Sequence, residues 1–257
     1  KKHHGMTFHA YARSIRINRA FGQIQKRNGI IDSALDSGYD SLSGFHTAFK
    51  KLTGISPSQS DTHQIITISR ILTPLGPMFA GATDLGICLL EFWDRRMLLT
   101  QFKRLGQLFK GTFVPGKTPL LTSLSDQIAE YFDGKRLDFD LPLDLRGTAF
   151  QVQAWKQLQT IPYGETRSYQ DQALRIGKAK AVRAVAKANG DNRISIIIPC
   201  HRVITKDGQL AGYGGGLWRK KYLLDLESKH KQKKNKISPI PVGYLNYRIN
   251  SNIIFFK

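Results

Sequence analysis

The sequence of 257 residues contains only two cysteines, Cys88 and Cys200. Two cysteines cannot form a disulfide framework, and no Cys-x-x-Cys pair suggests a metal site or any other bound cofactor. So little cysteine is typical of a reducing compartment, and we expect the protein in the cytoplasm. No cysteine precedes Cys88, so we expect no zinc site built from four cysteines in residues 1–87.

Long apolar runs and acidic side chains are also scarce. No run is long enough to span a membrane, and no signal-peptide pattern is present, so we expect no membrane partner. The 39 Lys and Arg residues exceed the 19 Asp and Glu residues and give a net charge of +20. Such an excess points to a polyanion such as nucleic acid as the partner; an evenly basic surface without such a partner is the alternative.

The positive charge is not spread evenly along the chain. Residues 61–144 are close to neutral, whereas residues 1–60, 145–227 and 228–257 each carry a basic excess. This distribution favours contact with nucleic acid by particular segments over an evenly basic surface.

Hydrophobic periodicity divides the chain into four parts and predicts a multidomain α+β protein. Residues 1–60 are predicted to be helical, residues 61–144 to form a small mixed α/β lobe, and residues 145–228 to form a mostly helical domain. Residues 229–257, rich in lysine and then in asparagine and isoleucine, are predicted to be a disordered basic tail.

Residues 31–37 and 41–52 are predicted to form two helices separated by a turn at Gly38, which together make a helix-turn-helix. In that motif the polar face of the second helix, here with His46 and Lys50, enters the major groove of DNA. The alternative is an ordinary helical hairpin whose polar face is only solvated, and periodicity alone favours neither. We expect residues 56–62, rich in turn formers, to be a linker.

The near-neutral lobe is predicted to contain strands at residues 65–71, 78–83 and 87–92 and one helix at residues 121–132. Cys88 falls in the most apolar of these strands, where we expect it to pack as a core residue. No catalytic motif is recognised in this lobe.

A second helix-turn-helix is predicted further along the chain. Thr166 can cap a helix at residues 167–176, and an alanine-rich helix follows at residues 179–189. Ala184 and its neighbouring alanines allow close approach to DNA, while Arg183 and Lys187 can contact phosphates. The alternative is that alanine simply favours helix.

The candidate reactive residue is Cys200, in Pro199-Cys200-His201-Arg202. It follows an apolar run at residues 196–198 that is predicted to be a buried strand. A neighbouring base can convert the thiol into a nucleophile, and Glu227 could orient His201. Adjacent residues of an extended chain point to opposite sides, so contact between Cys200 and His201 needs a turn or a bridging water. The alternative is that Cys200 is a small core residue. We expect a hairpin at residues 203–212 and a helix at residues 218–227.

Two resemblances to known families extend these predictions. Residues 73–227 resemble the O6-alkylguanine-DNA alkyltransferases, and residues 29–57 resemble the second helix-turn-helix of AraC-type regulators, a combination found in bacterial adaptive-response proteins. The first resemblance rests on Gly-Thr-Ala-Phe-Gln at 147–151, Ile-Pro-Tyr-Gly-Glu-Thr at 161–166, Ala-Val-Arg-Ala-Val at 181–185, Ala-Asn-Gly at 188–190, Pro-Cys-His-Arg-Val-Ile at 199–204 and Gly-Tyr-Gly-Gly at 212–215. The second rests on Ser-Gly-Tyr at 37–39, Phe-Lys-Lys at 49–51 and Gly-Ile-Ser-Pro at 54–57.

The alkyltransferase resemblance implies a ribonuclease H-like lobe, a winged-helix-like catalytic domain, and irreversible transfer of an alkyl group from O6-alkylguanine or O4-methylthymine in DNA to Cys200. It implies that a monomer without a cofactor acts on double-stranded DNA whose damaged nucleotide is flipped out. The implied catalytic residues are Cys200, His201, Glu227, Tyr169 and Asn192. The implied base-binding residues are Val203, Tyr213 and Gly214, and the expected DNA contacts are Arg183, Ala184, Lys187, Arg202, His46 and Lys50.

The AraC-type segment suggests a further role in activating transcription, with promoter DNA and RNA polymerase as partners. The sequence also leaves two other functions open. One is a transcription regulator in which methylation of Cys200 mainly serves as a sensor. The other is a cysteine hydrolase that uses Cys200 and His201, although it leaves the basic, alanine-rich helix without a role.

Overall fold

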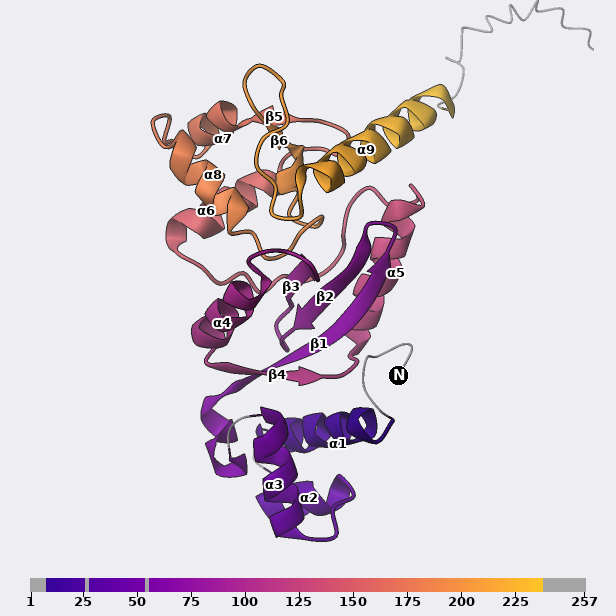
Figure 1. Ribbon diagram of the computed structural model, residues 1–257, viewed down its shortest axis with the longest axis vertical. Helices are drawn as coiled ribbons and strands as arrows, with labels where there is room; N and C mark the ends of the chain where they lie inside the picture. The colour runs from indigo at the N-terminus through magenta and orange to yellow at the C-terminus, as the bar shows by residue number, and fades with distance from the viewer. Residues whose placement is uncertain (1–7, 26–27, 54–55, 238–257) are drawn as a thin grey trace, which may run out of the picture.

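The computed structural model describes residues 8–25, 28–53 and 56–237, which form three stacked units (Figure 1). Helices α1 to α3 lie at one end of the molecule. A four-stranded sheet with helices α4 and α5 lies in the middle, and helices α6 to α9 lie at the other end. The expected multidomain α+β fold is therefore confirmed.

The N-terminal unit consists of α1 (Phe8–Gln25), α2 (Ile30–Asp36) and α3 (Leu42–Thr53). Phe21, Phe45 and Phe49 are fully buried and form its core, with the rings of Phe21 and Phe49 stacked at 5.3 Å. Gly38, with φ of 77°, makes the turn between α2 and α3, as a glycine can without strain. The predicted helix-turn-helix is present. Leu42, the first residue of α3, lies outside this core and is 41% exposed.

The segment expected to be a linker is folded. It forms a 3₁₀ helix, Pro57–Thr62, whose start is capped by Ser56 and Gln59. Ser60 is fully buried, and the segment packs against α1. The prediction of a linker is therefore wrong, because the turn-forming residues close a compact helical turn instead of spacing two units apart.

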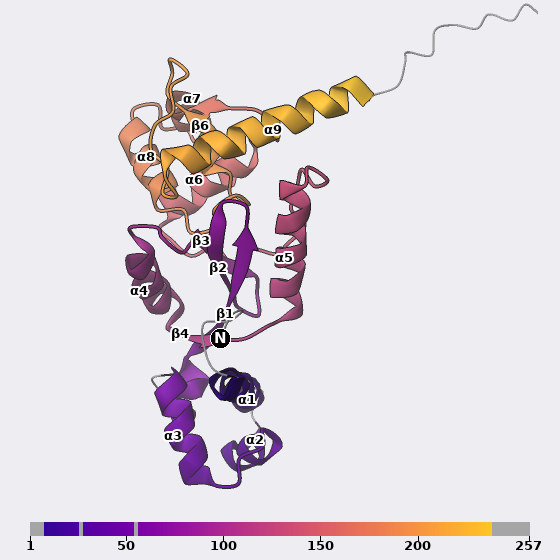
Figure 2. The same ribbon diagram turned by 45° about the vertical axis from the view of Figure 1, so that its right-hand side comes forward.

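The central sheet contains β1 (Gln64–Thr73), β2 (Gly76–Ala82), β3 (Ile87–Phe92) and β4 (Gly111–Pro115) in the order β3-β2-β1-β4. Adjacent strands are antiparallel except β1 and β4, which are parallel. The helices α4 (Leu98–Phe109) and α5 (Pro119–Phe132) cover opposite faces of the sheet (Figure 2). The three predicted strands and α5 are confirmed, but α4 and β4 were missed, so the lobe has two helices where one was expected.

The C-terminal unit begins with α6 (Ala149–Gln159), whose first turn is closed by the capping box of Thr148 and Gln151. The unit continues with β5 (Arg167–Ser168), α7 (Tyr169–Arg175), α8 (Val182–Gly190), a 3₁₀ turn (Cys200–Arg202), β6 (Val203–Ile204) and α9 (Leu217–Ile237). Ser168, and not the expected Thr166, caps α7, because its hydroxyl accepts a hydrogen bond from the Asp171 amide. Helix α8 starts at Val182, three residues later than expected.

Three further predictions for this unit are corrected. Residues 196–198 do not form a strand, and Ile196 has φ of 75°, which bends the chain before Cys200. The turn after β6 is present, but β6 pairs in parallel with β5 and not with a second hairpin arm. Helix α9 continues to Ile237, so the first part of the supposed disordered tail is helical. Residues 238–257 lie outside the described part of the chain.

Strand β3 joins the central sheet to the C-terminal unit. Leu90 pairs with Ile194 as an isolated bridge, and its amide donates to the Arg193 carbonyl at 2.8 Å. The Ser195 amide donates to the Leu90 carbonyl at 2.7 Å. The loop between α8 and Cys200 therefore rests on the edge of the sheet. Within the described residues, no helix has the length and apolar character needed to cross a membrane.

Candidate active site

Cys200 lies at the start of the 3₁₀ turn, where it is only 7% exposed. Its Sγ accepts a hydrogen bond from Asn192 Nδ2 at 3.2 Å. The same amide group donates to the Ile198 carbonyl at 2.8 Å, and Asn192 Oδ1 accepts from the Ile194 amide at 3.0 Å. Because every polar atom of the Asn192 side chain is bonded, Asn192 holds the thiol in one place.

His201 is fully buried next to Cys200 and points toward α9. Its Nε2 lies 2.9 Å from Glu227 Oε1, and its Nδ1 has no hydrogen-bond partner among the described residues. Because the 3₁₀ turn replaces an extended chain here, the two neighbouring side chains are not forced to opposite sides. The carboxylate fixes the orientation of the imidazole and leaves Nδ1 as the nitrogen able to exchange a proton.

Glu227 is the centre of a buried polar cluster. Its carboxylate accepts from Tyr131 Oη at 2.8 Å, from the Gly164 amide at 3.0 Å and from Arg202 Nε at 2.9 Å. Burial acts to raise the pKa of Glu227, but the His201 interaction and the Arg202 hydrogen bonds hold that pKa well below its usual range. The site therefore contains an ionised carboxylate at neutral pH.

The structure contradicts the prediction made for Arg202. It was expected to contact DNA, but it is 5% exposed, and its guanidinium donates to Glu227 and to the Ile161 carbonyl at 2.6 Å. A buried carboxylate needs a buried cation, and this requirement removes Arg202 from the surface.

The pKa of the Cys200 thiol is set by opposing effects. Burial raises it, whereas the hydrogen bond from Asn192 and then the positive charges of Arg95 and Lys220 lower it. Burial lowers the pKa of His201, although Glu227 acts in the opposite direction. The favoured resting state is therefore a neutral thiol and a neutral imidazole beside an ionised carboxylate.

Tyr169 and Lys220 shape the opposite side of the site. Tyr169 Oη donates to the Ala211 carbonyl at 2.9 Å, and burial followed by the nearby Cys200 raises its pKa to about 12. Lys220 Nζ donates to the carbonyls of Val203 at 2.5 Å and Ala211 at 2.6 Å. Burial lowers the pKa of Lys220 to about 8. Lys220 ties the strand after Cys200 to the loop that carries Tyr213.

Tyr213 and Gly214 belong to this loop. The Tyr213 ring lies edge-on to His201, with ring centroids 6.5 Å apart. Gly214 is backed by Arg95: a Cβ atom at Gly214 would lie 2.6 Å from Arg95 Cζ. The loop is thus held against the central lobe with no room for a side chain at this position.

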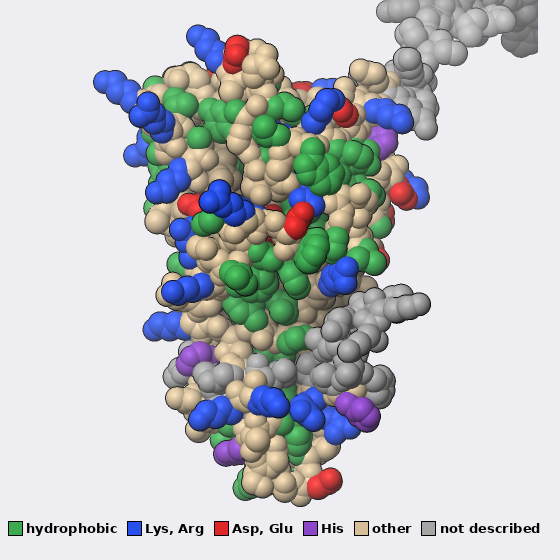
Figure 3. All heavy atoms as spheres, in the orientation of Figure 1, with side chains coloured by type: hydrophobic (Ala, Val, Ile, Leu, Met, Phe, Trp, Pro, Cys, Tyr) green, Lys and Arg blue, Asp and Glu red, His purple; other side chains and the backbone are tan. Residues whose placement is uncertain are grey.

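Helix α8 presents Arg183, Ala184 and Lys187 to solvent, as predicted for a DNA-facing surface. Lys and Arg side chains gather along the side of the molecule where α7 and α8 lie (Figure 3). The buried face of α8 is tied to α7 by paired hydrogen bonds between Asn189 and Gln172 at 2.7 and 3.1 Å. His46 and Lys50 are likewise exposed, on α3 at the far end of the molecule.

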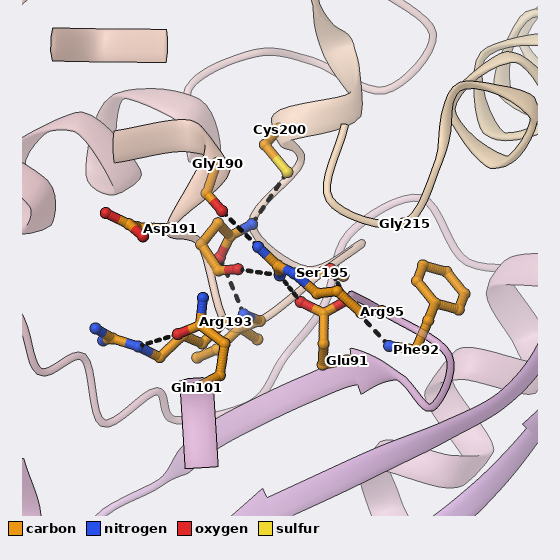
Figure 4. A network of polar contacts seen from close by, with 12 residues as sticks. Glu91, Phe92, Arg95, Gln101, Gly190, Asp191, Arg193, Ser195, Cys200 and Gly215 are labelled. Carbon is orange, nitrogen blue, oxygen red and sulfur yellow. Dashed lines mark hydrogen bonds and ion pairs between the residues drawn. The ribbon is translucent and has the colours of Figure 1, made fainter. Parts of the chain in front are cut away.

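Sequence reasoning missed several charged residues of the site, because their partners are distant in the chain. Arg95 and Glu91 come from the central lobe and lie against the loop before Cys200 (Figure 4). Tyr131, on α5, reaches Glu227. One feature of the sequence could have indicated such a role: Glu91 stands inside an otherwise apolar strand. Lys220 gives no such signal, because it lies between Arg219 and Lys221 in a polar helix.

In the described ranges, no three His, Cys, Asp or Glu side chains are grouped so that they could hold a metal ion. A cavity of about 610 Å³ lies between α7 and the turn after β6, and it is lined by Arg167, Arg175 and Lys206 among others. Cys200 is not part of its lining.

Three parts of the chain match models of known families. These are residues 149–229 (6-O-methylguanine DNA methyltransferase, DNA binding domain), residues 68–145 (its ribonuclease-like domain) and residues 1–62 (helix-turn-helix domain). The methylated-DNA–protein-cysteine methyltransferase of Mycolicibacterium paratuberculosis is 46% identical over 153 residues, covering 57% of this chain and 90% of that protein. A solved structure of Mycobacterium tuberculosis OGT in complex with DNA is 42% identical, covers 65% of this chain and 94% of that chain, and has a TM-score of 0.55.

A third relative covers most of the chain. The bifunctional transcriptional activator/DNA repair enzyme Ada of Escherichia coli is 33% identical over 232 residues, which is 89% of this chain. The alignment covers 65% of Ada, so the chain corresponds to a part of that protein.

Proposed function

The chain belongs to the methylated-DNA–protein-cysteine methyltransferase family, and on this premise we propose that Cys200 is the residue that accepts the alkyl group from O6-alkylguanine in double-stranded DNA. The observation that carries the proposal is the buried thiol held by Asn192 beside the His201–Glu227 pair. This arrangement combines a nucleophile with an oriented base and a fixed negative charge.

The proposed reaction starts with removal of the thiol proton. Cys200 passes its proton through water to His201 Nδ1, the nitrogen without a protein partner among the described residues, and Glu227 stabilises the imidazolium that forms. The thiolate then attacks the alkyl carbon. An S–C bond forms, the C–O6 bond breaks, and its electron pair remains on the guanine.

The leaving guanine anion is stabilised by the Tyr169 hydroxyl. The proton that left the thiol is then passed from His201 to the guanine, which leaves both the guanine and the imidazole neutral. Tyr169 lies on the loop side of the site, where it now bonds the Ala211 carbonyl. The S–C bond of the product is a stable thioether, which water does not hydrolyse under ordinary conditions. We therefore expect each molecule to react once, on O6-alkylguanine and also on O4-methylthymine.

DNA is delivered by α8 in this proposal. Arg183 replaces the flipped nucleotide in the base stack, Ala184 allows close approach in the minor groove, and Lys187 contacts phosphate. All three side chains are exposed on one helix. The flipped base lies between the backbone of Val203 and the loop of Tyr213 and Gly214. Because one chain supplies every one of these groups, the protein acts as a monomer.

Mass spectrometry of the Cys200 peptide tests the proposal. After incubation with an O6-methylguanine duplex, we expect one added methyl group on this peptide and one equivalent of repaired base per protein. Cys88→Ala should transfer the methyl group like the native chain, since Cys88 packs as a small apolar residue in the core. An unmodified Cys200 peptide beside repaired DNA would refute the assignment, and several turnovers per molecule would favour a hydrolase.

A second proposed function is activation of transcription through the N-terminal unit, in the bacterial cytoplasm. The support is the folded helix-turn-helix of α2 and α3 and the similarity to Ada over 89% of the chain. Promoter DNA and RNA polymerase are the proposed partners, with methylation of Cys200 as the signal. Promoter binding should weaken in the Lys50→Ala variant while repair is unchanged. Unaltered promoter binding would show that α3 does not recognise promoter DNA through Lys50.

We also propose that the chain divides functionally at residues 60 and 144, whereas the expected boundary at residue 228 falls inside α9. The separate core of α1 to α3 supports the first of these boundaries. Removal of residues 1–60 should leave repair intact, and a loss of repair in a folded fragment would show that the first boundary is wrong.

A further inference from the structure

Arg95 connects the central lobe to the segment that holds Cys200. It lies between β3 and α4 and is only 7% exposed, which is unusual for arginine. Its Nη1 donates to the Asn192 carbonyl at 2.9 Å, and its Nη2 donates to the Gly190 carbonyl (Figure 4). Gly190 is the last residue of α8, so the guanidinium also satisfies the negative end of the proposed DNA-binding helix.

Glu91 holds Arg95 in this position. Its carboxylate is fully buried, pairs with Arg95, and accepts from the Phe92 amide at 3.0 Å and Ser195 Oγ at 3.2 Å. A buried cation is stable only when an opposite charge and hydrogen-bond acceptors compensate for its lost hydration, and Glu91 and the two carbonyls do this for the terminal nitrogens of Arg95. The pair therefore forms a fixed support beneath the loop that leads to Cys200.

Arg95 also contacts the loop on the other side of the site. The guanidinium packs so closely on Gly214 that a Cβ there would lie 2.6 Å from Cζ. An added Cβ at Gly214 would therefore push against the guanidinium that bonds the carbonyls of Gly190 and Asn192. The neighbouring glycine, Gly215, is backed in the same way by the ring of Phe92. One side chain thus touches both walls of the site.

We propose that Arg95, held by Glu91, is a positioning residue for alkyl transfer: it fixes the backbone of Asn192, whose amide bonds the Cys200 sulfur, and supports the Gly214 loop. The inference rests on the proposed role of Cys200. The positive charge of Arg95 also acts on the sulfur, since the pKa of Cys200 is lowered by Arg95 after the larger opposing effect of burial and the hydrogen bond from Asn192.

The test compares Arg95→Met with Arg96→Met, a neighbour that is exposed. Two rates are measured against pH. One is methyl transfer from the duplex, and the other is the alkylation of Cys200 by iodoacetamide in the folded protein, followed by mass spectrometry of the peptide that contains Cys200. Loss of the cation and of the fixed amide should move both midpoints to higher pH in Arg95→Met. A shift of one unit corresponds to about a tenfold lower rate at pH below the midpoint. Arg96→Met should behave like the native chain.

Two further variants separate positioning from general stability. Arg95→Lys keeps the charge but loses the forked geometry, so it should transfer more slowly than the native chain with a smaller shift of the midpoint. Gly214→Ala should reproduce the upward shift, and should add little in an Arg95→Met background. Arg95→Lys and the single Gly214→Ala variant test the proposal even if Arg95→Met does not fold.

Unchanged midpoints in folded Arg95→Met would overturn the proposal, as would fully additive effects of Gly214→Ala and Arg95→Met. If the native chain transfers no methyl group at all, the proposed function fails. The iodoacetamide profile still decides the role of Arg95 in that case, because it reports the thiol without DNA.

Discussion

The molecule contains two helix-turn-helix pairs, α2–α3 and α7–α8, which differ in their packing and in the segments they lead into. The first pair is held by the aromatic core of Phe21, Phe45 and Phe49, and α3 leads into a 3₁₀ helix. The second is held by a smaller aliphatic cluster of Ala173, Ile176 and Val185 and by the hydrogen bonds between Gln172 and Asn189. Helix α8 leads within two residues to Asn192. The same motif therefore serves chemistry only where its last turn is bonded to reactive groups.

Among the substitutions that distinguish the two pairs, Glu227→Gln should have the largest effect on stability and on methyl transfer. It leaves Arg202 and the neighbouring donors of the C-terminal unit without their carboxylate. Loss of one partner of a buried ion pair costs about 3–5 kcal/mol. We expect this loss in the free energy of unfolding measured with urea, together with a loss of methyl transfer. Asp225→Asn, at an exposed ion pair of the same helix, is the control and should change neither.

Phe45→Ala should act on the other pair alone. Removing a fully buried phenylalanine from α3 costs about 3–5 kcal/mol. Hydrogen exchange should increase in α1 to α3 and stay unchanged in α6 to α9, with normal methyl transfer. Leu42→Ala, on the same helix but 41% exposed, is the matched control. Faster exchange throughout the chain would show that the two units unfold together.

Arg183→Ala should weaken repair by about tenfold to a hundredfold on duplex DNA, since the nucleotide that leaves the stack is no longer replaced. Transfer from the free alkylated base should be unaffected, because that substrate needs no flipping. Lys50→Ala, on α3, should leave both rates unchanged. Equal losses of the transfer rate on duplex DNA and on the free base would show that the substitution impairs the reactive site itself. That result would contradict a role of Arg183 in base flipping.

The smallest expected effect is a pH dependence of stability from His201. Burial lowers its pKa in the folded state, so below about pH 6.5 the unfolded chain binds a proton that the folded chain does not. Stability should therefore fall as the pH falls from about 6.5, by up to about 1.4 kcal/mol per unit for one proton. His201→Gln should remove this slope. His46→Gln, in the exposed pair, should retain it; retention of the slope in His201→Gln would refute the attribution.

Local sequence signals predicted most of the helices and strands. The apolar spacing of α3 and of β3, and the glycines at helix ends, act over a few residues and can be identified without tertiary information. These signals gave a wrong prediction where a stretch of sequence fits two local structures equally well. Thr166 and Ser168 can both cap a helix, but only Ser168 has an acidic residue three positions later to complete a capping box. The apolar run at residues 196–198 could equally be a strand or a buried irregular segment.

The sequence by itself determined the helix-turn-helix pairs, the basic segments, and the pairing of a reactive cysteine with a histidine and a distant glutamate. These depend on residue type and short spacing. Only the tertiary structure decided that Arg202, Arg95 and Lys220 are buried, because a charged side chain enters the interior only when partners from remote segments neutralise or bond it. Arg95 meets Asn192 from 97 positions away. No local pattern can encode that contact.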